Sequence, residues 1–162
     1  MSAGISESLD VLIGMIRGLA PKTDPYHSYV IDEDGSGTVI KLEDREASQQ
    51  PRVADLRFRP GGLPGDDGEA GLTSRRMRAG LVLRVQYPDG GDAGHWTRII
   101  AEDVAQLSLK LPMAYAESGA VAAGLQSIPP PGQASVQNIT DSDGAPVARR
   151  VSIPFDMIYL EA

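Results

Sequence analysis

Hydrophobic residues recur with the period of an α-helix in two parts of the chain. In residues 7–19 and again in 97–111 they are spaced three and four positions apart, which places them on one face of an amphipathic helix. Ser6 is expected to cap the first helix, and Pro112 to end the second. The positions predicted to face the core are Leu9, Leu12, Ile13 and Ile16 in the first helix and Ile100, Val104, Leu107 and Leu111 in the second.

The opposite face of the second helix is polar. Its exposed side chains are predicted to be Arg98, Glu102, Gln106 and Lys110. Arg98 and Glu102 have the i,i+4 spacing of a helical ion pair. The same geometry predicts a wet surface for Asp103 beside Glu102, so these two acids are expected to be solvated rather than to perform acid–base chemistry.

Alternating apolar and polar residues predict strands in the rest of the chain. Strands are expected at residues 27–31, 38–42, 53–58, 75–87, 134–140 and 148–160, the first two as a hairpin. In the fourth of these, the apolar residues face one side and Arg84 and Gln86 the other. In the last, apolar residues from Val151 to Tyr159 share one face, and Pro154, which lacks an N–H, predicts an edge position or a bulge.

Two long connections separate these elements. Residues 60–72 and 112–133 are predicted to be extended loops, and the first is expected to be mobile because it has too few apolar residues to enter a core. Within the second, the alanine-rich residues 114–128 are the alternative position of a short helix, against which Gly119 and Gly124 argue. Together the elements predict a single domain over residues 1–162. Its fold class is α+β, with two main helices packed on one face of a mostly antiparallel β-sheet and the other face free for a partner.

Composition limits the functions that this fold can have. The chain has 162 residues and a formal net charge of -7, so bulk attraction to nucleic acid or to an anionic membrane is not expected. It has no cysteine, which excludes disulfides, thiolate metal sites and cysteine nucleophiles. No apolar run approaches the roughly 20 residues that span a bilayer, and the N-terminal residues lack the basic region of a signal peptide.

Residues 32–43 match the spacing of a calcium-binding loop. The candidate ligands are Asp32, Asp34, Ser36, Thr38 and Glu43. An EF-hand needs a helix that enters the loop, whereas here Pro21 and Pro25 precede it and a β-rich run follows them. The context therefore favours a solvated hairpin turn without a metal. A Ca²⁺-binding module is the alternative from another functional class.

No arrangement of nucleophile and base is recognisable in the sequence. His27 and His95 have no acid, serine or second histidine at a catalytic spacing, and no serine has the Gly-x-Ser-x-Gly frame. The glycine-rich segment lacks the Gly-Lys-Ser/Thr of a phosphate-binding loop. We therefore expect a protein without a catalytic site or a cofactor, and a small hydrolase is the least favoured function.

The candidates for an interface are basic and aromatic. Arg75, Arg76 and Arg78 form the basic cluster of the sequence. Pairing with acids of a neighbouring subunit or of residues 60–72 is favoured over nucleic-acid binding, and such pairs set partner choice more than affinity. Trp96, just before the second helix, is either an interface anchor or a residue that packs onto that helix.

Several segments together resemble one protein family. They are the strand Leu83-Arg84-Val85-Gln86-Tyr87-Pro88, the Gly90-Gly91 turn, the helical Ile100-Ala101-Glu102-Asp103 and the final Ile153-Pro154-Phe155-Asp156-Met157-Ile158-Tyr159. In their order along the chain and in their pattern of residues, these segments are similar to the tail terminator (tail completion) proteins of tailed bacteriophages and gene transfer agents. The resemblance covers most of the chain, and it is looser at residues 63–71 and 114–131.

The resemblance implies a non-enzymatic, ring-forming subunit, commonly in a hexamer. Such a ring caps the tail tube, terminates tail assembly and joins the tail to the head-side connector or stopper protein. The implied partners are further copies of the chain, the tail tube protein and the connector, in the neck of a virion assembled in the host cytoplasm. DNA would pass through without specific binding, past Asp66, Asp67 and Glu69, which would face the lumen or a partner. A head-closure or neck adaptor ring is the alternative in the same setting.

Overall fold

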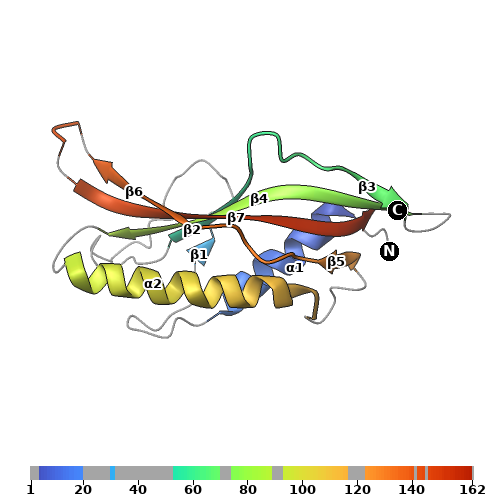
Figure 1. Cartoon of the computed structure of the whole chain (residues 1–162), viewed down its shortest axis with the longest axis horizontal. Coiled ribbons are helices and arrows are strands. Elements are labelled where there is room, and N and C mark those ends of the chain that lie inside the picture. Colours follow the sequence, from blue (N-terminus) through green and yellow to red (C-terminus); the bar gives the residue numbers. More distant parts are fainter. Residues whose placement is uncertain are drawn as a thin grey trace.

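Two long antiparallel strands run through the centre of the fold (Figure 1). The computed structural model describes residues 4–19, 30–31, 53–69, 74–88, 93–116, 123–140, 142–144 and 146–161. Within these residues the helices are α1 (Ile5–Gly18), α2 (Ala93–Lys110) and the 3-10 helix η2 (Leu111–Ala116). The strands are β1 (Val30–Ile31), β2 (Val53–Phe58), β3 (Gly65–Glu69), β4 (Arg75–Pro88), β5 (Leu125–Ser127), β6 (Ser135–Thr140) and β7 (Pro146–Glu161).

The described strands form one seven-stranded sheet with β4 and β7 in the middle. These two strands pair antiparallel from Arg75 opposite Glu161 to Pro88 opposite Ala148. β2 and β3 pair with different parts of β4, and β6 and β5 pair with different parts of β7, all antiparallel. The short β1 is parallel to β2. The α+β class and the mostly antiparallel sheet predicted from the sequence are therefore confirmed.

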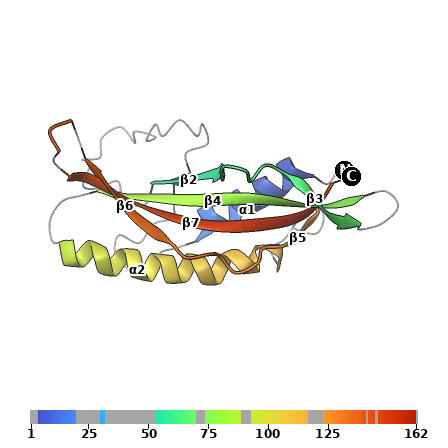
Figure 2. The same cartoon turned by 45° about the horizontal axis from the view of Figure 1, so that its top comes forward.

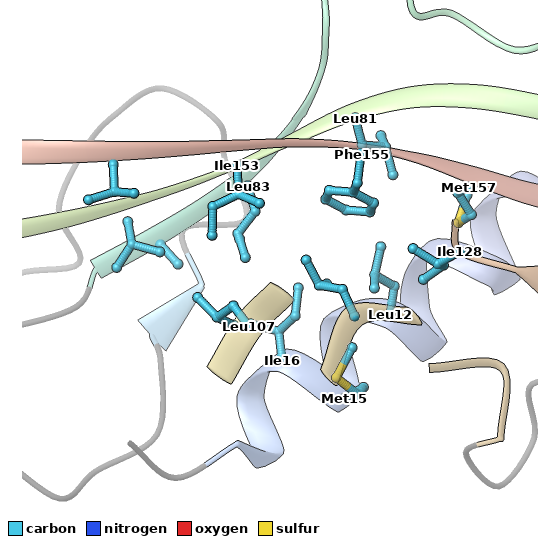
Figure 3. Close-up of a cluster of buried hydrophobic side chains, with 14 of the residues drawn as sticks. Leu12, Met15, Ile16, Leu81, Leu83, Leu107, Ile128, Ile153, Phe155 and Met157 are labelled. Carbon is cyan, nitrogen blue, oxygen red and sulfur yellow. The ribbon is translucent and has the colours of Figure 1, made fainter. Parts of the chain in front are cut away.

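The core lies between the sheet and the two helices, which cover the same face (Figures 1 and 2). The alternate apolar residues of β4 and β7 face the helices, as their spacing predicts. Across the two strands Leu81 lies opposite Phe155 and Leu83 opposite Ile153, and these side chains are buried. Figure 3 shows these side chains above the apolar faces of the helices. The buried helix residues that it labels are Leu12, Met15 and Ile16 of α1 and Leu107 of α2.

The segment predicted to be a mobile loop over residues 60–72 contains a strand. β3 occupies Gly65–Glu69 and pairs with the first part of β4. For these five residues the predicted loop was wrong, because the prediction relied on the low apolar content of the segment, whereas this strand is held by backbone pairing and by charges on β4. The second predicted loop, over residues 112–133, likewise contains most of η2 and all of β5.

Both helices begin earlier than predicted. The N-cap of α1 is Gly4, which makes no side-chain capping hydrogen bond. The Ile5 N–H donates to Oε2 of Glu161 at 3.2 Å, so a carboxylate at the end of β7, rather than Ser6, satisfies the helix N-terminus. α2 begins at Ala93, about one turn before its predicted start. In the described part of the chain, neither helix has the length and apolar character needed to cross a membrane.

Pro154 lies in β7, a central strand of the sheet. The edge position predicted for this proline applies to one side of the strand, over a short stretch. On one side of β7 the proline lies opposite Val82 of β4. On the other side β6 pairs as far as Ser152 and β5 pairs at Ile158, so no described strand pairs with β7 at the proline. The Gly132 N–H donates to the Pro154 carbonyl at 2.8 Å across this gap. Because the N–H and C=O of a residue in an antiparallel strand point the same way, the N–H that proline lacks would face the gap.

Candidate functional site

The sheet face opposite the helices carries many charged side chains. Alternation along β2, β4 and β7 sends their polar residues to this side, which we call the open face because no described helix covers it. Its arginines are Arg57, Arg59, Arg76, Arg78, Arg84 and Arg150, and its acids are Asp55, Asp67 and Asp156. Six guanidinium groups thus face three carboxylates, in a chain whose formal net charge is -7.

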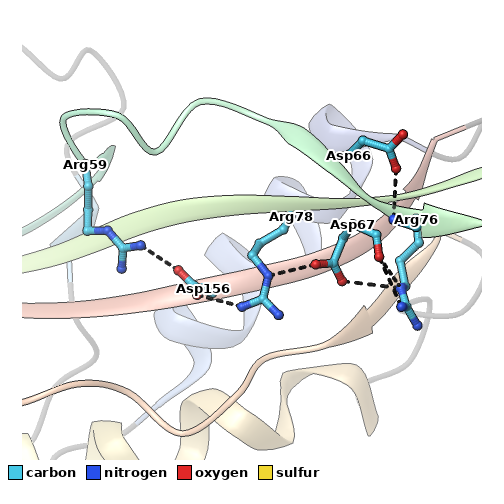
Figure 4. A network of polar contacts seen from close by, with 7 residues as sticks. Arg59, Asp66, Asp67, Arg76, Arg78 and Asp156 are labelled. Atoms are coloured by element: carbon cyan, nitrogen blue, oxygen red, sulfur yellow. Dashed lines mark hydrogen bonds and ion pairs between the residues drawn. The ribbon is translucent and has the colours of Figure 1, made fainter.

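One part of the open face is a chain of alternating arginines and aspartates (Figure 4). Asp156 of β7 accepts from Arg59 Nη2 at 2.6 Å and from Arg78 Nη1 at 2.8 Å. Asp67 of β3 accepts from Arg78 Nε at 3.1 Å and lies 3.3 Å from Arg76 Nε. These contacts connect three strands and the turn after β2, and they explain why a glycine- and aspartate-rich segment forms a strand beside β4.

A glycine in β4 makes room for this network. The backbone of Arg59 and Gly62 in the turn after β2 is hydrogen-bonded to Gly80, with Arg59 N–H to the Gly80 carbonyl at 2.9 Å and Gly80 N–H to the Gly62 carbonyl at 2.8 Å. A Cβ atom on Gly80 would lie 2.5 Å from Arg59 Nη2. The absence of a side chain at Gly80 therefore lets Arg59 cross the strand and reach Asp156.

The predicted interface arginines have partners within the chain. Arg75 Nη1 pairs with Asp66 Oδ2 at 2.5 Å, and Arg76 and Arg78 pair with Asp67. Pairing with acids of residues 60–72, one of the two partners predicted for this cluster, is confirmed. Contact with a neighbouring subunit stays a prediction.

The acids predicted to line a lumen are members of β3. Asp66 accepts the Gly68 N–H at 2.9 Å, and this bond together with Arg75 holds its pKa below the ordinary value. Asp66 and Asp67 are thus paired side chains of a strand rather than free acids of a loop. Glu69 lies opposite Arg75, and its side chain is outside the described residues. Their position relative to a lumen or a partner stays a prediction.

The pKa of Asp156 reflects its two arginine partners. Burial raises the pKa, but hydrogen bonds from Arg78 and Arg59 and the charges of both outweigh burial and hold the pKa below its ordinary value of 3.8. A lowered folded-state pKa means that the stabilisation is complete above the unfolded-state pKa. It is lost as pH falls through the folded-state pKa.

We therefore expect Asp156→Asn to lower the free energy of unfolding by roughly 1 kcal/mol at neutral pH, a modest value because both arginines are more than a third exposed and screened by solvent. Urea unfolding from pH 7 to pH 3 should give a constant difference between wild type and variant above about pH 5 and a shrinking one below about pH 4. Asp10→Asn, at an exposed position of α1, is the control. A difference for Asp156→Asn that persisted undiminished at pH 3 would contradict the assignment.

A second part of the open face gathers three arginines around one acid. Asp55 of β2 lies opposite Arg84 of β4 and accepts from it twice, from Nε at 2.8 Å and from Nη2 at 2.5 Å. Arg57 Nε lies 3.3 Å from the same carboxylate. Arg150 of β7 lies opposite Gln86, one alternate position along β4 from Arg84, and its Nη2 donates to Gln86 Oε1 at 3.4 Å. We call Arg57, Arg84 and Arg150 the arginine cluster.

Sequence reasoning missed a buried acid in α2. Asp103, predicted to be wet, is fully buried, and its Oδ2 accepts a hydrogen bond from the Tyr87 hydroxyl at 2.7 Å. Gln106, also predicted to face water, is buried as well. The buried face of α2 is broader than predicted because it also includes Ile99, and Asp103 and Gln106 follow Ile99 on the same side of the helix at i+4 and i+7. Including Ile99 in the apolar face would therefore have predicted that Asp103 is buried.

Several predicted sites lie outside the described residues. They are the calcium-like loop with Asp32, Asp34, Ser36, Thr38 and Glu43, the predicted strand 38–42, His27, and the side chains of His95 and Trp96. The predictions for them are untested. In the described part of the chain no group of three or more histidines and acids is placed to hold a metal ion.

No protein-family model and no curated protein matches the chain. The open face and its arginine cluster are therefore interpreted from their own chemistry.

Proposed function

We propose that this chain is the subunit of a homo-oligomeric ring that caps the tail tube of a tailed phage or gene transfer agent. The ring terminates tube growth and joins the tail to the head-side connector. It is a structural component of the virion neck, and DNA passes through it without specific binding. The resemblance of the β4, α2 and β7 segments to tail terminator proteins suggests this function.

The observation that carries the proposal is the one-sided sheet. Both helices pack on one face, while the opposite face presents nine charged side chains from β2, β3, β4, β7 and the turn after β2. A surface of this kind suits a contact with a different patch on the next subunit, and repeated contacts of that type close into a ring when the rotation allows. The strand pairs connected by the network in Figure 4 give each subunit a rigid face for such contacts.

The proposal is tested by measuring assembly of the purified protein. Light scattering coupled to size exclusion, over a wide range of protein concentration, should show a discrete oligomer. Electron microscopy should show a closed ring with a central channel. The ring, added to polymerising tube protein, should bind one tube end and stop elongation. A protein that remains monomeric at every concentration and binds no tube end would overturn the proposal.

A further inference from the structure

The arginine cluster has more positive charge than its own acids neutralise. Asp55 is the single carboxylate within ion-pair distance of Arg57 and Arg84 among the described residues. Arg150 has no ion pair there, and its described partner is the neutral side chain of Gln86. Within the described part of the chain, three guanidinium groups therefore share one carboxylate, which is an excess of two positive charges on neighbouring strands.

Two further observations show that the cluster is unsaturated. Arg57 Nε is buried and makes no hydrogen bond, although Asp55 lies at ion-pair distance. Burial, and then the charge of Arg84, lower the pKa of Arg150 below the ordinary value of arginine; Asp55 opposes this effect and Arg57 adds to it. Partly desolvated like charges on neighbouring strands are unfavourable unless an anion neutralises them.

We propose that the arginine cluster is an interface site that receives a carboxylate from an acidic surface of a second copy of this chain. This inference rests on the proposed ring and names one of the contacts that would close it. A carboxylate suits the site because a guanidinium donates two parallel hydrogen bonds to its two oxygens, as Arg84 already does to Asp55.

A second copy is the partner that charge complementarity favours. The chain has 22 acids and 15 lysines and arginines, and six of those arginines lie on the open face with only three of the acids. The rest of each subunit is therefore more acidic than the chain as a whole. In a ring the open face of one subunit meets a different surface of the next, so basic and acidic surfaces would face each other. Nucleic acid is a poorer partner because the net charge of -7 opposes a phosphate backbone.

The experiment compares assembly of the full chain with that of charge variants. Arg150→Gln removes one charge without removing a described ion pair, and Arg150→Glu reverses it. We expect the concentration needed for assembly to rise about tenfold or more for Arg150→Gln, and assembly to be lost for Arg150→Glu. Arg98→Gln is the matched control, because Arg98 is highly exposed on α2, in the helix layer. It should assemble like the wild type. Circular dichroism and thermal unfolding should show that all variants are folded.

A cross-linking measurement identifies the partner directly. A photoreactive residue at position 152, opposite Arg84 on the open face, leaves all three arginines in place. In a mixture of isotopically light and heavy copies it should give cross-links between copies that map to acidic segments. Wild-type assembly with unchanged assembly of Arg150→Glu would overturn this inference and leave the proposed ring intact. A wild type that never assembles would overturn the ring, and this inference with it. If the wild type bound duplex DNA, Arg150→Gln abolished this binding and no cross-links formed between copies, the cluster would be a phosphate site. That result would also overturn the inference.

Discussion

Replacing Gly62 by alanine is expected to lower the free energy of unfolding by about 2–4 kcal/mol. A Cβ atom on Gly62 would overlap the Gly80 carbonyl oxygen and lie 2.9 Å from the carbonyl carbon. Those atoms belong to the backbone of β4 in the middle of the sheet, so they cannot move away without disturbing the pairing with β7. The turn after β2 must instead separate from the strand.

The size of the effect follows from the contacts that separation breaks. Two backbone hydrogen bonds attach the turn to Gly80, and leaving buried backbone groups unpaired costs about 1–3 kcal/mol each. If the turn instead stays in place, the crowding of a well-packed site costs a similar amount of free energy. For a domain of this length each kcal/mol corresponds to about 2–4 °C in Tm, so thermal unfolding should shift by roughly 5–15 °C.

Two other glycines are matched controls for Gly62→Ala. The three atoms nearest to a Cβ atom on Gly80 all belong to the guanidinium of Arg59, which is a flexible side chain that can swing away. Gly80→Ala should therefore break the Arg59–Asp156 pair at a cost of about 1 kcal/mol or less. A Cβ atom on Gly65 would have no neighbouring atom within 4 Å, so Gly65→Ala should be nearly neutral. Equal Tm values for the Gly62 and Gly65 variants would refute the proposed role of the turn.

The parts of the fold that the sequence predicts well have strict local periodicity. β2 begins and ends as predicted, and β4, β6 and β7 agree to within two residues. In β4 and β7 one face is buried under the helices and the other carries charge, so alternation determines which residues point inward. Both helices were predicted for the same reason, although their N-termini extend beyond the periodic residues.

The charged open face is less predictable because it depends on contacts distant in sequence. Asp156 and Arg59 are 97 residues apart, and Asp55 and Arg84 are 29 apart. No periodic pattern reveals that β3 will pair with the arginines at the start of β4, since glycine and aspartate are both unfavourable in strands. The sequence singled out Arg75, Arg76 and Arg78 because they are neighbours along the chain. Arg57, Arg84 and Arg150 come together only through strand register, so they formed no visible motif.

The buried contact between Tyr87 and Asp103 gives a further test of the fold. The Tyr87 hydroxyl lies at the end of β4 and donates to a fully buried carboxylate of α2, so this bond connects the sheet to the helix layer. Tyr87→Phe keeps the ring and removes the donor. We expect the free energy of unfolding to fall by about 1–3 kcal/mol, because a buried carboxylate that loses one hydrogen bond keeps the cost of its desolvation. Chemical denaturation of the wild type and the variant measures this difference.

Tyr159→Phe is the matched control for this hydrogen bond. Tyr159 is as deeply buried in the neighbouring strand β7 and faces the same side of the sheet, but its hydroxyl makes no hydrogen bond to a described residue. Burial, together with the charge of Glu161, raises the pKa of its hydroxyl. Removing that hydroxyl should change stability by less than about 0.5 kcal/mol.

Variants of Asp103 test the same hydrogen bond from the other side. In Asp103→Asn the side-chain oxygen still accepts from Tyr87, whereas Asp103→Leu has no acceptor, so the leucine variant should lose more stability. In the Asp103→Leu background, Tyr87→Phe should cause little further loss. Additive losses for Tyr87→Phe and Asp103→Leu would show that the two residues stabilise the protein independently, against the contact described above.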